Sequence, residues 1–286
     1  MKYAFISGRE SVFSVKRMCK VLSVTRSGYY AWSKRPPSKR EQSNQALLEM
    51  IKRIFQSSRK TYGSPRICAS LHRRGYQCGH NRVARLMTMH GIVARRRHRS
   101  FPVTTQRQPG VIPAPNLLKR DFTADRPNQK WVTDITYIDT AEGWLYLASV
   151  MDLFSRKVVG WAMSDKIDSA LATNALHMAW TTRRPRSALL HHSDQGSQFT
   201  GTAYQQMLAE MGCQISMNRT GEVYDNAAME SFFATLKTEC VIGQFTTRVE
   251  ARRTIFEYLE GWYNLQRLHS SLDYLSPAEF ETSSGH

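Results

Sequence analysis

The spacing of apolar residues changes character near residue 129. In the helical segments that precede residue 93, apolar residues recur every three or four positions, which is typical of helices with one buried face. After residue 129, apolar runs short enough for strands alternate with helical segments. Three adjacent strands followed by alternating helices and strands predict a mixed α/β sheet. We expect strands at 131–139, 144–152, 157–164, 188–192 and 213–217, and helices at 169–183, 201–211, 226–240 and about 247–265.

The first sixty residues carry the pattern of a helix-turn-helix. Ser14 and Thr25 are good N-caps for two short helices within residues 14–32, and a further helix is expected near 44–57. In this arrangement the second short helix presents Arg26 to DNA. A helical hairpin with an aromatic core is the alternative interpretation.

Residues 61–92 predict a second unit of the same kind. A helix capped by Ser64 is followed by another at about 81–90. The apolar stripe of the later helix faces inward, so Arg82 and Arg85 are expected to point outward, where they could contact DNA.

Residues 93–128 have the composition of a linker, with a basic run and several prolines. The basic residues Arg95, Arg96 and Arg97 suit contact with a phosphate backbone. We therefore divide the chain into an all-α helix-turn-helix region (1–60), a second helix-turn-helix-like unit (61–92), a basic proline-containing linker (93–128) and a catalytic core with a C-terminal helix and tail (129–286).

The amino-acid composition indicates that the protein binds a polyanion. The 286 residues include 40 Lys and Arg against 23 Asp and Glu, a formal net charge of +17. A surface needed only for solubility would carry charges of both signs, so the scarcity of acids favours nucleic acid as the partner. The five cysteines are odd in number, and no apolar run approaches the roughly 20 residues of a membrane span. We expect a reduced, cytoplasmic protein.

Three carboxylates stand where the predicted elements could bring them together. Asp134 lies inside the first strand, Asp194 follows the fourth, and Glu230 lies one turn into a helix capped by Asn226. Each acid has a plain alternative: a strand-edge residue, a turn residue and an exposed helix acid. A charge within an apolar strand is costly without a partner or a metal, which favours a shared site. Asp152 is the neighbouring acid most easily mistaken for a ligand.

The spacing and surroundings of these acids resemble a known superfamily. Between Asp194 and Glu230 lie 35 residues, as in the D,D-35-E polynucleotidyl transferases of the retroviral-integrase type. Four strings resemble the second-reading-frame (OrfB) product of the IS-three family of bacterial insertion sequences. They are Trp-Val-Thr-Asp-Ile-Thr-Tyr (131–137), His-Ser-Asp-Gln-Gly-Ser-Gln-Phe (192–199), Asp-Asn-Ala-Ala-Met-Glu-Ser-Phe-Phe (225–233) and the aromatic segment 263–280. The resemblance covers nearly the whole chain and implies a ribonuclease H-like integrase core with a five-stranded sheet.

The resemblance implies a DNA transposase that nicks and transfers strands at Asp134, Asp194 and Glu230. It also implies two Mg²⁺ ions per active site, with Mn²⁺ able to substitute, and carboxylate oxygens are suitable ligands for both. Lys237 resembles the basic residue that follows the catalytic glutamate and contacts DNA; an exposed helix lysine is the alternative. The implied partners are the terminal repeats of the element, target DNA, further copies of the chain and the upstream reading-frame product, at the bacterial nucleoid.

Two rival functions use the same features. A DNA-binding regulator with an inactive core would need only the N-terminal units, but the intact set of three acids argues against it. A structure-specific ribonuclease of the same fold is disfavoured by the basic N-terminal third.

Four residues in the second helical unit could be mistaken for zinc ligands: Cys68, His72, Cys78 and His80. Their spacing matches no common structural zinc pattern, and Cys68 lies among apolar residues, where a thiol packs as a small hydrophobic group. We expect no zinc there.

The C-terminal tail is rich in aromatic residues and too short for a domain. We expect its rings to pack beside the helix that carries Glu230, with Arg267 and His269 directed towards DNA. A purely structural brace is the alternative for these two residues.

Overall fold

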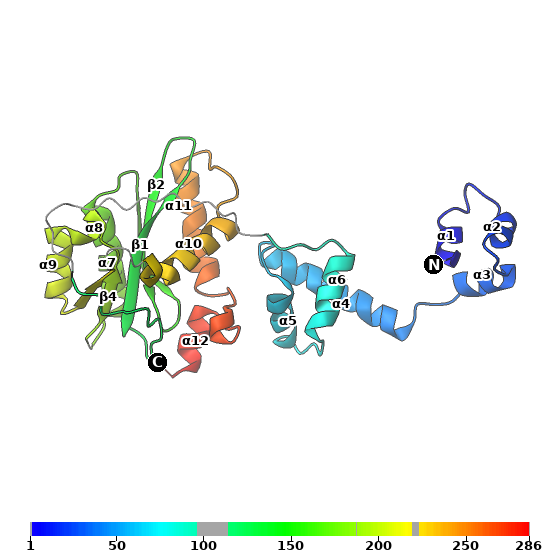
Figure 1. Cartoon of the computed structure of the whole chain (residues 1–286), viewed down its shortest axis with the longest axis horizontal. Coiled ribbons are helices and arrows are strands. Elements are labelled where there is room, and N and C mark those ends of the chain that lie inside the picture. The colour runs from blue at the N-terminus through cyan, green and yellow to red at the C-terminus, as the bar shows by residue number, and fades with distance from the viewer. Residues whose placement is uncertain (1, 96–113, 187, 219–222, 286) are drawn as a thin grey trace. The chain divides into compact units, whose positions relative to one another are not determined.

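The computed structural model describes residues 2–95, 114–186, 188–218 and 223–285 (Figure 1). The chain forms two compact units, Met1–Arg53 and Ile54–His286. The four-part division expected from composition is finer than this one and stays a prediction. No helix in the described ranges is long and apolar enough to cross a membrane.

The first unit contains the short helix pair expected from the sequence, α2 (Val15–Val21) and α3 (Arg26–Ser33). Thr25 caps α3 as predicted, because its Oγ1 accepts a hydrogen bond from the Gly28 N–H at 3.1 Å. An additional helix, α1 (Lys2–Ser7), was not predicted from the sequence. A small core joins the three helices and consists of Ile6, Met18, Cys19 and Tyr29.

Helix α4 (Lys39–Ser57) starts five residues earlier than the apolar stripe suggested. Helix α5 (Ser64–His72) has Gly63 rather than Ser64 at its N-cap, and α6 (His80–Met89) follows. The Ser64 hydroxyl instead pairs with the Nε2 atom of His80 at 2.9 Å. Ser64 is thus used between helices rather than as a cap.

The sheet has five strands in the order β3-β2-β1-β4-β5. Strands β1 to β3 form an antiparallel meander, while β4 and β5 run parallel to β1. This arrangement confirms the mixed α/β sheet and its five strands. The strands are β1 (Lys130–Ile138), β2 (Leu145–Asp152), β3 (Val158–Ser164), β4 (Leu190–Ser193) and β5 (Gln214–Met217).

Helices cover both faces of this sheet (Figure 1). On one face α7 (Ser169–Arg183) and α9 (Thr202–Glu210) bury the largest core cluster, which includes Trp131. Strand β3 can approach α7 closely because of Gly160, where a Cβ would meet the Ala175 carbonyl oxygen at 2.3 Å. On the other face lie α10 (Ala227–Glu239) and α11 (Arg248–Phe256).

Two of the predicted core helices differ from the expectation. The 201–211 segment is preceded by a separate short helix, α8 (Ser197–Thr200), and Gly201 is the N-cap of α9. The 247–265 segment is a regular α-helix only through Phe256 and continues as a π-helix, Glu257–Tyr263. The short helix α12 (Pro277–Ser283) then ends the described fold, with a capping box between Ser276 and Glu279.

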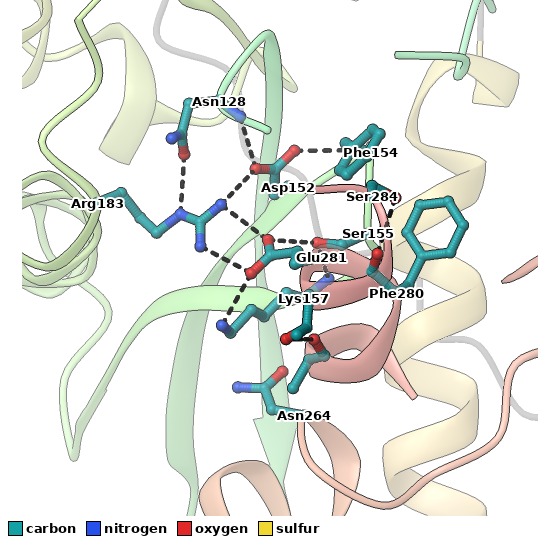
Figure 2. Close-up of polar contacts among 12 residues, drawn as sticks. Asn128, Asp152, Phe154, Ser155, Lys157, Arg183, Asn264, Phe280, Glu281 and Ser284 are labelled. Carbon is teal, nitrogen blue, oxygen red and sulfur yellow. Dashed lines mark hydrogen bonds and ion pairs between the residues drawn. The ribbon is translucent and has the colours of Figure 1, made fainter. Parts of the chain in front are cut away.

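Helix α12 is fixed to the core by a network of charges (Figure 2). Glu281 accepts hydrogen bonds from Arg183 at 2.8 and 3.0 Å, from Lys157 at 3.0 Å and from the Ser155 hydroxyl at 2.8 Å. The same arginine reaches Asp152 at 3.2 Å. Five side chains from β2, the following turn, α7 and α12 thus form one connected group.

Candidate active site

Asp134 lies on β1, and Asp194 directly follows the end of β4, the parallel neighbour of β1. In the pairing of β1 with β4, Trp131 stands beside His191 and Val132 beside His192. Continued two positions past the last paired residues, the same offset of 60 would bring Asp134 beside Asp194, which directly follows the last residue of β4. Adjacent strands are about 4.8 Å apart, so the register alone brings the two carboxylates close together.

The third acid is connected to this pair through Asn226. The Asn226 side-chain amide donates a hydrogen bond to Asp134 Oδ2 at 2.7 Å, and α10 begins at the next residue. Glu230 therefore lies one turn into α10, and its side chain is exposed. Asn226 occupies the N-cap position, as expected, but its side chain makes no capping hydrogen bond. Its amide is committed to Asp134 instead, a role that the local sequence did not indicate.

Asp134 is in an environment that opposes its negative charge. Burial raises its pKa to about 8, with further increases from the charges of Asp194 and Glu230. The hydrogen bonds from the Ile135 N–H and from Asn226 lower it but do not compensate. The charges of Asp194 and Glu230 therefore both act on the Asp134 carboxyl group. Three carboxylates offer only oxygen ligands, and the repulsion between them is not offset by the hydrogen bonds to Asp134. Such a set fits a hard divalent cation such as Mg²⁺ or Mn²⁺.

Lys237 lies two turns after Glu230 on α10. Its side chain is half-buried, and burial lowers its pKa while the charge of Asp134 raises it. The ammonium group is therefore close enough to Asp134 to interact with it. Contact with DNA stays a prediction for this residue.

The two histidines before Asp194 support the strand end and are both buried. His191 Nε2 pairs with the Tyr204 hydroxyl at 3.1 Å. His192 pairs through Nδ1 with the Ser216 hydroxyl at 2.8 Å and through Nε2 with Asn218 Oδ1 at 2.6 Å. Both rings are thus engaged with protein groups, which agrees with a supporting role.

Asp152, the acid most easily mistaken for a ligand, has structural contacts. Its carboxylate is fully buried and accepts hydrogen bonds from the backbone N–H groups of Asn128 and Phe154 at 2.8 and 3.1 Å (Figure 2). Arg183 is its ion-pair partner, so Asp152 has the contacts expected of a carboxylate that is buried in the protein core.

Arg267 requires a correction, because the structure buries it instead of directing it outward. The side chain is 4% exposed and its guanidinium holds the Glu239 carboxylate at 2.8 to 3.0 Å. The Tyr258 hydroxyl and the Trp262 ring N–H complete the partners of Glu239. The expected packing beside α10 is confirmed, since the Tyr263 ring lies 5.0 Å from the Phe232 ring. Arg267 therefore belongs to a buried brace.

The other predicted DNA-contact residues lie on helices or at the end of the described N-terminal segment. Arg26 on α3 and Arg85 on α6 are exposed, and Arg82 is half-buried. Arg95 is exposed, while Arg96 and Arg97 lie outside the described residues. Their contact with DNA stays a prediction.

Three of the four possible zinc ligands gather in the structure, although their spacing suggested no site. The ligand atoms of Cys68, His72 and Cys78 all lie within 4.8 Å of one another. His72 Nε2, however, lies 2.6 Å from the Cys78 carbonyl oxygen and so must donate a proton to it. His80 is engaged with Ser64. The ring nitrogen that zinc would need is already in use, so the absence of zinc stays our prediction.

Comparison with protein families identifies three matching regions. Residues 124–222 and 211–277 each match a model described as integrase core domain. Residues 42–100 match a model described as HTH-like domain.

Curated relatives extend this similarity over nearly the whole chain. The chain is 43% identical over 285 residues to transposase InsF for insertion sequence IS3A of Escherichia coli (strain K12), covering 98% of both chains. It is 42% identical over 264 residues to the insertion element IS600 uncharacterized 31 kDa protein of Shigella sonnei, covering 92% of this chain and 97% of that one.

Solved structures give a weaker likeness. A chain of the simian T-cell lymphotropic virus intasome in complex with PP2A regulatory subunit B56 gamma is 13% identical, with a TM-score of 0.47 over 74% of this chain and 69% of that one. The HTLV-2 integrase catalytic core domain in complex with magnesium is 18% identical, with a TM-score of 0.40 over 55% of this chain and 98% of that one.

Proposed function

The chain belongs to the IS3 family of insertion-sequence transposases, polynucleotidyl transferases with an integrase core, and from this premise we propose that Asp134, Asp194 and Glu230 catalyse nicking and strand transfer at the ends of its element. One observation carries the proposal. Asp134 on β1 lies beside the parallel strand β4, which Asp194 directly follows, and the Asn226 hydrogen bond joins Asp134 to the start of the helix that presents Glu230.

The chemistry of the proposed reaction requires an oxygen nucleophile and neutralisation of charge on the phosphoryl group in transit. Two divalent ions, Mg²⁺ or Mn²⁺, held by the three carboxylates would supply both. Asp134 and Asp194 are fixed by the sheet and by hydrogen bonds from Asn226, Ile135 and the Gly196 N–H. Glu230 is exposed on a helix, so it is the member of the set that can adjust when DNA binds.

The remaining residues of the site serve binding and positioning. Asn226 holds the Asp134 carboxylate in one orientation, while Lys237 offers a cation to a phosphate of the bound strand. Water and the freed 3′-hydroxyl of the element would serve in turn as nucleophiles in this single site.

The partners follow from the reaction. Element ends and target DNA are the substrates, and joining two ends requires at least two end-binding modules, which a symmetric assembly of copies would provide. We place the reaction at the nucleoid in the bacterial cytoplasm, with the upstream reading-frame product as a possible fusion partner.

A cleavage assay on end-labelled DNA with Mg²⁺ tests the proposal. We expect Asp134→Asn, Asp194→Asn and Glu230→Gln each to lose at least about 10³-fold in nicking and strand transfer, because several kcal/mol of transition-state stabilisation are removed. DNA binding in a gel shift should remain. The exposed acid Asp165, changed to Asn, is the matched control. Activity within tenfold of the parent in any one of the three variants would overturn the assignment, and binding without any cutting by the parent would favour a DNA-binding regulator.

A further inference from the structure

A cavity of about 350 Å³ lies against α10, on a face of the helix next to the one that carries Glu230. Ser231 directly follows Glu230 and lines the cavity, as does Thr235 one turn later. Successive residues of a helix are about 100° apart, so the cavity and the catalytic acid occupy adjoining sectors of α10.

Three arginines line the cavity: Arg66 of α5, Arg156 of the turn between β2 and β3, and Arg267 of the tail. No carboxylate lines it among the residues that the structure describes. The charge of Arg267 is balanced by Glu239 behind the wall. His269, also in the wall, is neutral, because burial and the three arginines lower its pKa to about 2. The cavity therefore has a surplus of two positive charges.

Arg156 is the residue that most needs a partner. Its side chain is half-buried, and the structure gives its guanidinium no ion pair or hydrogen-bond acceptor within the described ranges. Burial also lowers the pKa of both Arg156 and Arg66, so each cation is held where water stabilises it poorly. An anion in the cavity would relieve both.

The backbone at Arg156 has a strained conformation. Its φ angle is +60°, the left-handed conformation that non-glycine residues rarely adopt. The neighbouring residues are clamped: Ser155 bonds to Glu281, Lys157 pairs with Glu281, and the Asp152 N–H donates to the Lys157 carbonyl oxygen at 2.9 Å (Figure 2). The turn is thus held in one conformation, with Arg156 in the cavity wall.

The volume and lining of the cavity indicate a ligand larger than a free anion. Its volume is at the lower end for organic ligands and exceeds that of a phosphate group. Rings of Phe122, Phe232 and Tyr263 form part of the wall, and aromatic rings are the groups on which nucleic-acid bases stack. Arginines supply the forked donors that suit phosphate.

We propose that this cavity is a nucleotide subsite, in which Arg66 and Arg156 bind a phosphate of a single DNA strand and the rings of Phe122 and Tyr263 contact its base. The inference rests on the proposed function for the identity of the strand, which is the one that passes Glu230. The subsite adjoins the face of α10 that carries Glu230, because Ser231, which directly follows Glu230, lines the cavity.

The test uses the full chain in EDTA, where no strand cutting is expected, and a single-stranded hexathymidylate that carries 2-aminopurine at one position. We expect 2-aminopurine fluorescence to change for one position of the strand on binding. Affinity should fall about tenfold or more in Arg156→Gln and in Ser231→Phe, which fills the cavity, and should recover in Arg156→Lys. Arg253→Gln, at an exposed arginine of α11, is the matched control. Thermal melting of each variant confirms that it is folded.

Equal affinity of the parent, Arg156→Gln and Ser231→Phe would overturn the subsite. Competition by inorganic phosphate as strong as that by thymidine monophosphate would overturn its assignment to a nucleotide. The binding measurements do not depend on strand cutting. If Glu230→Gln retained cutting activity, the proposed function would fail, but binding in EDTA would still show whether the cavity binds a nucleotide. If binding were unaffected in the variants while Glu230→Gln abolished cutting, only the subsite would fail.

Discussion

Asn226 donates a side-chain hydrogen bond to Asp134 at 2.7 Å across 92 positions of the chain. The bond joins the end of the 3₁₀ turn Val223–Asn226 to the middle of β1. It therefore links the start of the helix that carries Glu230 to Asp134.

Changing Asn226 to Ala is expected to lower the rate of strand cutting about 10- to 100-fold. A hydrogen bond to a charged group is worth about 1.5–3 kcal/mol, and each 1.4 kcal/mol corresponds to about tenfold in rate. The measurement is single-turnover cutting of end-labelled DNA, with Asn81→Ala at an exposed position of α6 as control. An unchanged rate in Asn226→Ala would show that the orientation of Asp134 does not depend on this bond.

Protein stability should fall in acid because His191 is buried in its neutral form. Burial, and secondarily the charge of His192, lowers its pKa to about 3, whereas the unfolded chain has a histidine pKa of about 6.5. Between these values the unfolded state binds the extra proton, so stability rises with pH and is lost as pH falls below about 6.5. The loss from this group is about 2 kcal/mol at pH 5.

Chemical denaturation from pH 5 to 8 measures this dependence. His191→Gln should flatten the curve relative to the parent, whatever its stability at pH 8. His177→Gln, at an exposed position of α7, should leave the slope as it is. Parallel curves for the parent and His191→Gln would contradict the prediction.

Arg267→Ala is expected to destabilise the fold by about 3–5 kcal/mol, because it leaves the Glu239 carboxylate buried without its cation. The double variant Arg267→Met, Glu239→Leu should recover much of that loss, since it removes both charges. Lys52→Ala breaks an exposed pair with Glu49 and should cost less than about 1 kcal/mol. If Arg267→Ala weakened DNA binding without lowering the denaturation midpoint, the buried brace would be the wrong role.

Lys237→Gln should reduce by about one the slope of log affinity against log salt for element-end DNA, as expected when one phosphate contact is lost. Lys237→Arg keeps the charge and should keep the slope. Fluorescence anisotropy over a salt series gives both numbers. An identical slope in all three proteins would indicate that Lys237 acts on Asp134 alone.

Cobalt(II) added to the reduced protein is expected to produce no thiolate-to-metal charge-transfer band. The described ligands Cys68, His72 and Cys78 are three in number, and the His72 ring nitrogen is bonded to a carbonyl oxygen. A stoichiometric band that disappears in Cys68→Ser would contradict this and establish a metal site.

Features encoded within a few residues were predictable from the sequence. Helix α7 was predicted to the residue, because Asp168 caps it by accepting from the Leu171 N–H and the periodic pattern ends at Arg183. The positions of Asp134 inside β1 and of Asp194 directly after β4 were also expected from the short apolar runs that surround or precede them.

Features that depend on distant partners were not predictable in this way. Asn226 has the composition of a cap, but a carboxylate on β1 holds its side chain. Arg267 looks like a surface cation until Glu239, 28 positions earlier, is placed beside it. The π-helix at Glu257–Tyr263 was likewise not expected, and two of its residues, Tyr258 and Trp262, contact the distant Glu239.

The network around Glu281 can be completed only at a late stage of protein synthesis. Arg183 and Lys157 leave the ribosome about a hundred residues before the carboxylate that pairs with both. Until that carboxylate emerges, the turn that carries Arg156 lacks its clamp. A product that stops short of residue 281 would therefore contain Asp134, Asp194 and Glu230 but lack the clamp on the turn that carries Arg156.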